Sequence, residues 1–229
     1  MMRIWVVVAA LCLVLPAWAE DSGPGRMTVT GEGSVDSVPD MATITLGVTA
    51  EARAAADAMR ETSQATAAVL QRLAAAGIEP RDLRTRDLSL SPVWDNRNSS
   101  ARPKIVGFEA RNTVVVRVRD LDGLGGVLDE VIESGANLFQ GLSFGLQDPG
   151  PALDEARRQA VAEARRKAVL YAEAAGLELG AVLEFNESSG SPRPVMMMER
   201  AAMASPVPIA AGEVSTRASV TMVFAIGGG

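Results

Sequence analysis

Apolar and polar residues alternate strictly in one early stretch of the chain. The apolar positions are Ala42, Ile44, Leu46 and Val48, and the positions between them are Thr43, Thr45, Gly47 and Thr49. A period of two predicts a β-strand with one buried face. Less complete versions of the same pattern predict further strands near residues 88–90, 114–118, 137–146, 182–187 and 220–226.

The period changes to that of a helix in two long stretches. One covers about residues 52–76, with Val69 and Leu73 on its apolar stripe and Gly77 as its stop. The other covers residues 153–175, with a small-residue inner face and Gly176 as its stop. A shorter helix is expected to run through Glu133, with an aspartate cap from the turn at residues 120–123.

These elements predict an α+β fold. We expect a mixed, mostly antiparallel sheet with two long helices and one short helix packed on one face. Val69-Leu70 and Gly77 recur as Val127-Leu128 and Gly135, which suggests two intimately packed halves over residues 27–120 and 121–226. The alternative is one domain, because any helix that packs on a sheet and ends at glycine has this pattern.

The first nineteen residues have the parts of a secretion signal. Arg3 provides a positive charge, residues 4–15 form an apolar run, and Ala17 and Ala19 are the small residues that signal peptidase requires. We expect cleavage after Ala19, a flexible mature N-terminus over residues 20–26, and export to the periplasm. A retained anchor is the alternative, but the run is short for a bilayer, and no transmembrane segment is expected in the mature chain.

The composition excludes several kinds of chemistry. The chain has no histidine, and its one cysteine, Cys12, lies within the expected signal. Catalysis by Ser-His-Asp or Cys-His systems, histidine or cysteine zinc sites, and disulfides are therefore not expected in the mature protein. Loss of residues 1–19 removes Arg3 and no acidic residue, so the formal charge of −6 becomes −7. Nucleic acid is an unexpected partner at that charge, and no cofactor is predicted.

An ordered set of short motifs resembles the SIMPL domain, a family of bacterial periplasmic proteins. The set covers residues 27–226 and consists of Gly31-Glu32-Gly33, Pro39-Asp40-Met41-Ala42, Gly77-Ile78, Leu83-x-Thr85, Gly135-Ala136-Asn137, Ala156-Arg157, Ala164-Arg165-x-Lys167-Ala168 and Gly176-x-x-x-Gly180. The resemblance implies an exported α+β protein of a kind that, in some members of the family, forms ring- or channel-like oligomers and is linked to envelope or oxidative stress. It implies no catalytic residues. Ser63-Gln64 stands where family members often carry an asparagine.

Candidate catalytic residues are few. Glu32, Asp36 and Asp40 are expected to cluster near an early turn, where two of them would form an acid and base pair for hydrolysis. Turn formation is the commoner role for such residues. Lys104 and Lys167 are the two lysines available for a Ser-Lys pair, although Glu163 already accounts for Lys167. The run of glycines at residues 123–126 lacks the lysine of a phosphate loop.

A methionine cluster is the one candidate metal site. Met196, Met197, Met198 and Met203 lie in a long loop expected over residues 188–212. Thioether sulfurs bind Cu(I), a soft ion, without histidine or cysteine. The same side chains also absorb oxidant as sulfoxides or form a pliable contact with another subunit. The contact is the preferred interpretation, because methionine alone is a weak motif.

The sequence therefore predicts a non-enzymatic, exported SIMPL-type protein of the cell envelope. We expect it to form a homo-oligomer, with an envelope protein or the outer membrane as further partners. A Cu(I) or small-molecule binding module is the alternative function, and a hydrolase that uses only carboxylates is a third. Strand edges and the 188–212 loop are the expected contact surfaces.

Overall fold

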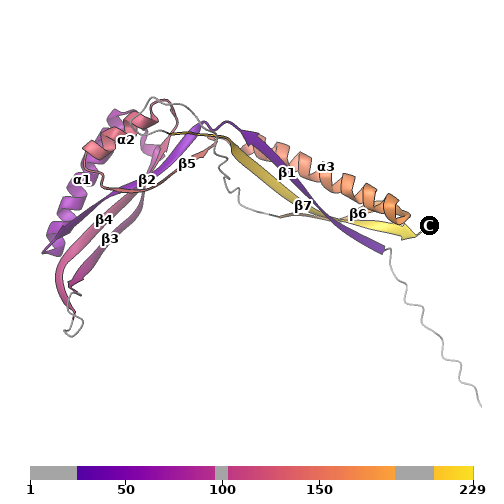
Figure 1. Cartoon of the computed structure of the whole chain (residues 1–229), viewed down its shortest axis with the longest axis horizontal. Coiled ribbons are helices and arrows are strands. Elements are labelled where there is room, and N and C mark those ends of the chain that lie inside the picture. The colour runs from indigo at the N-terminus through magenta and orange to yellow at the C-terminus, as the bar shows by residue number, and fades with distance from the viewer. Residues whose placement is uncertain (1–24, 96–102, 189–208, 229) are drawn as a thin grey trace, which may run out of the picture.

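A computed structural model describes residues 25–95, 103–188 and 209–228, which form two antiparallel sheets and three α-helices. The α+β class predicted from the sequence is confirmed. In place of one sheet, the strands form a three-stranded sheet in the order β1-β7-β6 and a four-stranded sheet in the order β3-β4-β2-β5. Figure 1 shows the sheets end to end at an angle, with the helices on the outer side of the bend.

The four-stranded sheet contains the stretch in which apolar and polar residues alternate. Its strands are β3 (Leu83–Asp95), β4 (Lys104–Val118), β2 (Met41–Ala52) and β5 (Leu138–Gly145). Helices α1 (Ala55–Ala75) and α2 (Leu124–Glu133) pack on the face to which Ile44 and Leu46 point. The predicted strand at residues 42–49 is therefore confirmed, and its apolar side forms the core of this sheet. The register pairs Asp95 with Lys104, so β3 and β4 form a hairpin.

The three-stranded sheet joins segments that are far apart in the sequence. Strand β1 (Gly25–Ser37) pairs along its whole length with β7 (Val214–Gly228), and β6 (Leu177–Ser188) pairs with the other side of β7. Helix α3 (Gly150–Ala175) packs on one face. Each sheet takes strands from both of the sequence halves considered above, because β1 lies beside β7 and β5 lies beside β2.

Helix α3 lies unusually close to β1 because both surfaces lack large side chains. A Cβ atom added at Gly31 would lie 2.1 Å from the carbonyl oxygen of Ala160, and one at Gly33 would lie 2.0 Å from that of Ala156. No side chain larger than hydrogen fits at either glycine without a shift of the helix. The buried residues of α3 are all alanines, namely Ala156, Ala160, Ala164, Ala168 and Ala172.

Two of the predicted helix stops are confirmed, and the predicted cap of the short helix is wrong. Gly77 and Gly176 have φ angles of 84° and 68°, the left-handed conformation expected of glycine stops. The aspartate cap predicted for α2 is wrong. Gly123 is the N-cap, with no side-chain hydrogen bond, and Asp120 instead accepts a hydrogen bond from the Asp122 N–H within the turn.

The sequence spacing along α3 favours an i, i+4 pair between Asp154 and Arg158 on a solvated face. The basic residues do lie on a solvated face, but two pairs three residues apart replace that pair. Arg157 lies 3.1 Å from Asp154, and Arg158 lies 2.9 Å from Glu155. The hydrogen bond from Arg158 is the main cause of the lowered pKa of Glu155. These pairs neutralise Arg157 and Arg158 on the helix surface.

Candidate functional site

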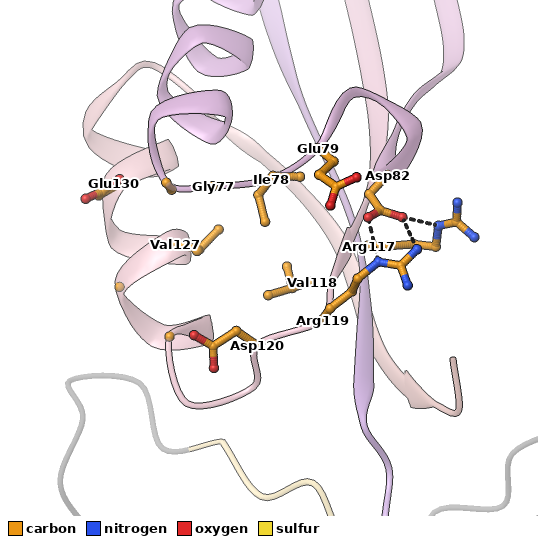
Figure 2. A pocket seen from close by; sticks show the side chains of 13 residues that line it. Gly77, Ile78, Glu79, Asp82, Arg117, Val118, Arg119, Asp120, Val127 and Glu130 are labelled. Atoms are coloured by element: carbon orange, nitrogen blue, oxygen red, sulfur yellow. Dashed lines mark hydrogen bonds and ion pairs between the residues drawn. The ribbon is translucent and has the colours of Figure 1, made fainter. Parts of the chain in front are cut away.

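A buried carboxylate, Asp82, holds two arginines at one end of the four-stranded sheet. Asp82 ends the short 3-10 helix η1 (Pro80–Asp82), and its side chain is 2 % exposed. Arg119 donates two hydrogen bonds to it, from Nε to Oδ2 at 2.7 Å and from Nη2 to Oδ1 at 2.9 Å. The Nε atom of Arg117 lies 3.1 Å from Oδ1. Figure 2 shows the two guanidinium groups side by side at this carboxylate.

The electrostatics of this cluster keep it ionised. The hydrogen bonds from Arg119 lower the pKa of Asp82, the charges of Arg119 and Arg117 add to that effect, and burial opposes it. The hydrogen bonds with Asp82 raise the pKa of Arg119 in turn. A carboxylate held in its charged form is poorly suited to proton transfer near neutral pH. The cluster is therefore suited to fixing charge in place.

A pocket of about 450 Å³ opens beside the cluster. Its walls are the residues after α1, the end of β4 and one side of α2. Ile78, Val118 and Val127 surround the space in Figure 2. The side of α2 that faces the pocket includes Gly126, where an added Cβ would meet no atom within 4 Å. The pocket therefore combines an apolar interior with missing side-chain volume.

Carboxylates line the rim of this pocket, and each has a partner. Glu130 lies 3.6 Å from Arg72, and Glu79 lies 2.7 Å from Arg81. Asp120 accepts a backbone hydrogen bond from its own turn. The acids are therefore engaged separately, which favours a binding role for the pocket over hydrolysis by two cooperating carboxylates.

The outer edge of strand β1 is covered by polar side chains from α3. Glu163 Oε2 accepts a hydrogen bond from the Glu32 N–H at 2.6 Å, and Gln159 Oε1 accepts one from the Ser34 N–H at 3.3 Å. Lys167 Nζ donates to the Thr30 carbonyl at 3.1 Å. These three side chains occupy backbone groups that would otherwise pair with another strand.

The outer edge of strand β6 has no partner strand among the described residues. Within the part of the chain that the structure describes, β6 pairs with β7 alone, and no side chain is hydrogen-bonded to its backbone. Leu183 and Phe185 are 46 % and 53 % exposed, and Val182 is 39 % exposed. Two register shifts interrupt the pairing with β7 near these residues. β6 therefore combines free backbone groups with exposed apolar side chains, which is typical of an interaction edge.

The structure does not gather the predicted acid cluster at a turn. Glu32 and Asp36 lie within strand β1, which corrects the prediction, and Asp40 alone lies in the turn before β2. The carboxylate of Asp40 accepts a hydrogen bond from the Gln147 N–H at 2.7 Å. The period of two was missed in β1 because its inward residues include Gly31 and Gly33, which carry no apolar signal.

The other candidates are placed as follows. Lys167 lies 3.2 Å from Glu163, as predicted, while Lys104 is the first residue of β4. Met196, Met197, Met198 and Met203, the expected signal over residues 1–19 and residues 20–24 of the expected flexible N-terminus lie outside the described residues. Gly25 and Arg26, the last two residues of that expected segment, belong to strand β1. None of the helices in the described ranges is long and apolar enough to span a membrane.

Sequence reasoning missed the Asp82 cluster altogether. Arg81-Asp82 follows Pro80 and has the composition of an ordinary turn, and Arg117 and Arg119 are two charges at the end of a strand. The i, i+2 spacing of these arginines indicates that both side chains lie on one face of the sheet. Their common partner could not be found, because it lies 35 residues away from Arg117 along the chain.

The fold and the sequence together define the class of protein. The sequence model of the SIMPL family, described as a protein of unknown function (DUF541), matches residues 27–224. The chain belongs to this family, which confirms the resemblance noted above.

Named relatives cover between 79 % and 94 % of the chain. The chain is 39 % identical over 226 residues to the 26 kDa periplasmic immunogenic protein of Brucella melitensis biotype 1, with 93 % of this chain and 90 % of the relative covered. It is 33 % identical over 182 residues to the uncharacterized protein YggE of Edwardsiella ictaluri, covering 79 % of this chain and 75 % of the relative. With YggE of Escherichia coli, also called uncharacterized, it shares 30 % identity over 220 residues, covering 94 % and 87 %.

Proposed function

We propose that the protein is a non-enzymatic component of the bacterial cell envelope, exported to the periplasm, that acts by self-association and supports tolerance of envelope or oxidative stress. Two observations support the compartment: the signal-like residues 1–19 and the periplasmic name of the Brucella relative. The open apolar edge of β6 is the observation that carries the self-association.

The partner of this edge is a second copy of the chain. β6 carries Glu178, Glu184 and Glu187 and no basic residue. Arg26 lies 3.9 Å from Glu184 and Arg157 lies 2.8 Å from Glu187, so Glu178 alone of these three has no ion pair among the described residues. The edge strand β3 of the other sheet begins with Arg84 and Arg86. Strand addition between β6 of one copy and β3 of the next joins opposite charges and forms backbone hydrogen bonds. A contact between two different surfaces repeats from copy to copy, so it closes into a ring when the rotation allows.

The apolar side chains of the two edges support the same pairing. Leu88 and Leu90 of β3 are 56 % and 42 % exposed. They lie on the helix side of the sheet, where α1 packs on the inner strands β4 and β2. Phe185 of β6 is exposed to a similar degree. Association would remove these groups from water, and burial of about 100 Å² of apolar surface stabilises a contact by about 2.5 kcal/mol before the entropy of association is subtracted.

The titratable groups support a role without catalysis. Every carboxylate in the described ranges with a resolved pKa shift, namely Asp82, Glu155 and Glu163, has a lowered pKa. A general acid that works near neutral pH requires a raised carboxyl pKa instead. Each of the three is explained by hydrogen bonds to its partners, which is a structural role.

Light scattering coupled to size exclusion tests the proposal. The chain from residue 20 onward is measured at several concentrations, and a mass of several chains is expected at micromolar concentration. Phe185→Lys is expected to lower the mass, because it places a charge in the contact. The control is Ile132→Lys, since Ile132 on α2 is 60 % exposed, a fraction similar to that of Phe185, but lies away from the strand edges. A single-chain mass throughout, or equal effects of both variants, would contradict the proposal.

The stress role has a separate test in cells. A strain that lacks the gene is complemented with the wild-type chain, with Phe185→Lys, or with a variant in which the four candidate methionines are leucine. Survival of peroxide is expected to depend on Phe185 and to tolerate the leucines, since the preferred role of the methionines is a pliable contact. Loss of survival and of Cu(I) binding in the leucine variant would favour the metal or oxidant functions instead.

A further inference from the structure

The four-stranded sheet has one face that no described helix covers. Helices α1 and α2 both pack on the apolar face, and the opposite side carries the alternate residues of β2 and β4. Thr43 and Thr45 of β2 lie there, paired in register with Arg117 and Val115 of β4. Hydroxyl and guanidinium groups therefore dominate this end of the open face, and they require a polar partner or solvent.

A cleft of about 360 Å³ lies on this face, separate from the pocket beside α2 but sharing Asp82 and Arg117 with it. It is lined by Thr43, Arg81, Asp82, Arg84, Val115 and Arg117. Half of the lining residues are arginines, and one is a carboxylate. The whole chain has a formal charge of −6, so this local excess of positive charge runs against the composition of the protein.

The charges in the cleft are not all neutralised. Glu79 engages Arg81 at 2.7 Å, and Asp82 is shared between Arg117 and Arg119. Within the described residues, Arg84 has no acidic partner. One arginine charge at Asp82 is therefore in excess, and Arg84 adds a second.

The cleft is also partly preorganised. Arg117 donates from Nη2 to the Arg81 carbonyl at 3.0 Å, and its Nε lies against Asp82, which fixes the direction of its side chain. Its side chain is still 45 % exposed, which leaves donors toward the cleft. Figure 2 shows Arg117 extending away from the helices at Asp82. A guanidinium group held in place loses less entropy when it binds an anion.

We propose that this cleft binds a small phosphate-bearing anion. Arg117 and Arg84 would contact the phosphate oxygens, because guanidinium groups match that geometry with two hydrogen bonds each. The Thr43 hydroxyl adds a neutral donor, and Val115 contacts the apolar part of an ester. The volume limits the ligand to a phosphate group with a short substituent, either a free metabolite or the headgroup of a lipid.

Isothermal titration calorimetry with inorganic phosphate and with glycerol phosphate tests the site on the chain from residue 20 onward, in chloride buffer at low salt. Arg84→Gln is expected to weaken binding about tenfold or more, since it removes a charged hydrogen-bond donor from the anion. Arg84 is free of ion pairs among the described residues, so the variant is expected to fold. The matched control, Arg165→Gln on the exposed face of α3, makes the same charge change and is expected to bind as the wild type does.

The outcomes are distinct. The absence of binding to the wild-type chain, or equal weakening by both substitutions, would overturn the proposal. Vesicles of phosphatidylglycerol and of phosphatidylcholine identify the source of the phosphate: sedimentation with the anionic vesicles that depends on Arg84 supports a lipid headgroup, and binding of glycerol phosphate alone supports a soluble ester. Titration of Phe185→Lys with phosphate separates this site from self-association, because the cleft lies within one chain and does not include Phe185. This variant is expected to bind phosphate as the wild type does even at a reduced mass, and loss of its phosphate binding would overturn the proposal.

Discussion

The two edge strands of the three-stranded sheet, β1 and β6, flank the same central strand. They differ in the hydrogen bonds that α3 makes to their outer edges. At β1 the helix approaches closely over Gly31 and Gly33, and three of its polar side chains bond to the outer backbone groups. At β6 the outer edge carries no such bonds in the described structure, and apolar side chains are exposed. One helix therefore closes one edge and leaves the other open.

This difference shows how a sheet can select one surface for association. An unprotected edge pairs with other strands without much regard for sequence, so a protein that needs one contact must block the others. Glycine in β1 and alanine in α3 allow the close approach, and the approach brings Gln159, Glu163 and Lys167 within reach of the β1 backbone. The small residues thus have a purpose beyond packing, because they position the polar groups that block the edge.

The largest expected effect comes from forcing α3 away from β1. Gly31→Ala places a Cβ 2.1 Å from a carbonyl oxygen of α3, so we expect a loss of about 3 kcal/mol in the free energy of unfolding. Urea denaturation followed by circular dichroism measures this. Gly145→Ala is the control, since its Cβ would meet no atom within 4 Å. Equal stability of the two variants would show that the close approach is not required.

The next largest effect is expected at Asp82, which lies away from both β1 and β6. It tests whether stability can change without a change in association. Asp82→Asn removes the common partner of Arg117 and Arg119, and we expect a loss of about 2 kcal/mol, less than for a fully buried pair because the arginines are partly exposed. Thermal denaturation measures the loss, and light scattering is expected to give the wild-type mass. A changed mass at intact stability would link this cluster to association instead.

A smaller effect on stability, but a change in association, is expected when the β1 edge is uncovered. The double variant Glu163→Ala, Lys167→Ala frees two backbone groups of β1, so a second edge becomes available for strand pairing. We expect a larger mass or earlier aggregation in light scattering at the same concentration. The comparison variant is Glu173→Ala, an exposed acid further along α3. A wild-type mass for the double variant would show that these side chains do not protect the edge.

The smallest effect is on pH dependence. The hydrogen bond from the Glu32 N–H is the first cause of the lowered pKa of Glu163, followed by its bond with Lys167. Glu163 therefore stabilises the fold above its ordinary pKa of about 4.3, and this contribution is lost as the pH falls through the lowered pKa. Glu163→Gln is expected to show a shallower decline of stability below about pH 5. Urea titrations at several pH values measure both slopes, and identical slopes would contradict the assignment.

The sequence was sufficient to predict those elements that a local hydrophobic period defines. The strand at residues 42–49, the two long helices and the glycine stops were predicted because neighbouring residues define them. The split into two sheets was not, because Thr30 pairs with Thr221 across most of the chain. The covering of the outer edge of β1 by α3 side chains could not be predicted for the same reason. It depends on a helix more than a hundred residues away, and on glycines that carry no hydrophobic signal.

The central claim is that β6 is the open edge at which copies associate while β1 is closed. Hydrogen exchange measured by mass spectrometry at increasing protein concentration tests this directly. We predict that peptides from residues 177–188 become protected as the concentration rises, while peptides from residues 25–37 exchange at a constant rate. Protection of β1 with β6 unchanged, or no dependence on concentration in either strand, would contradict the account.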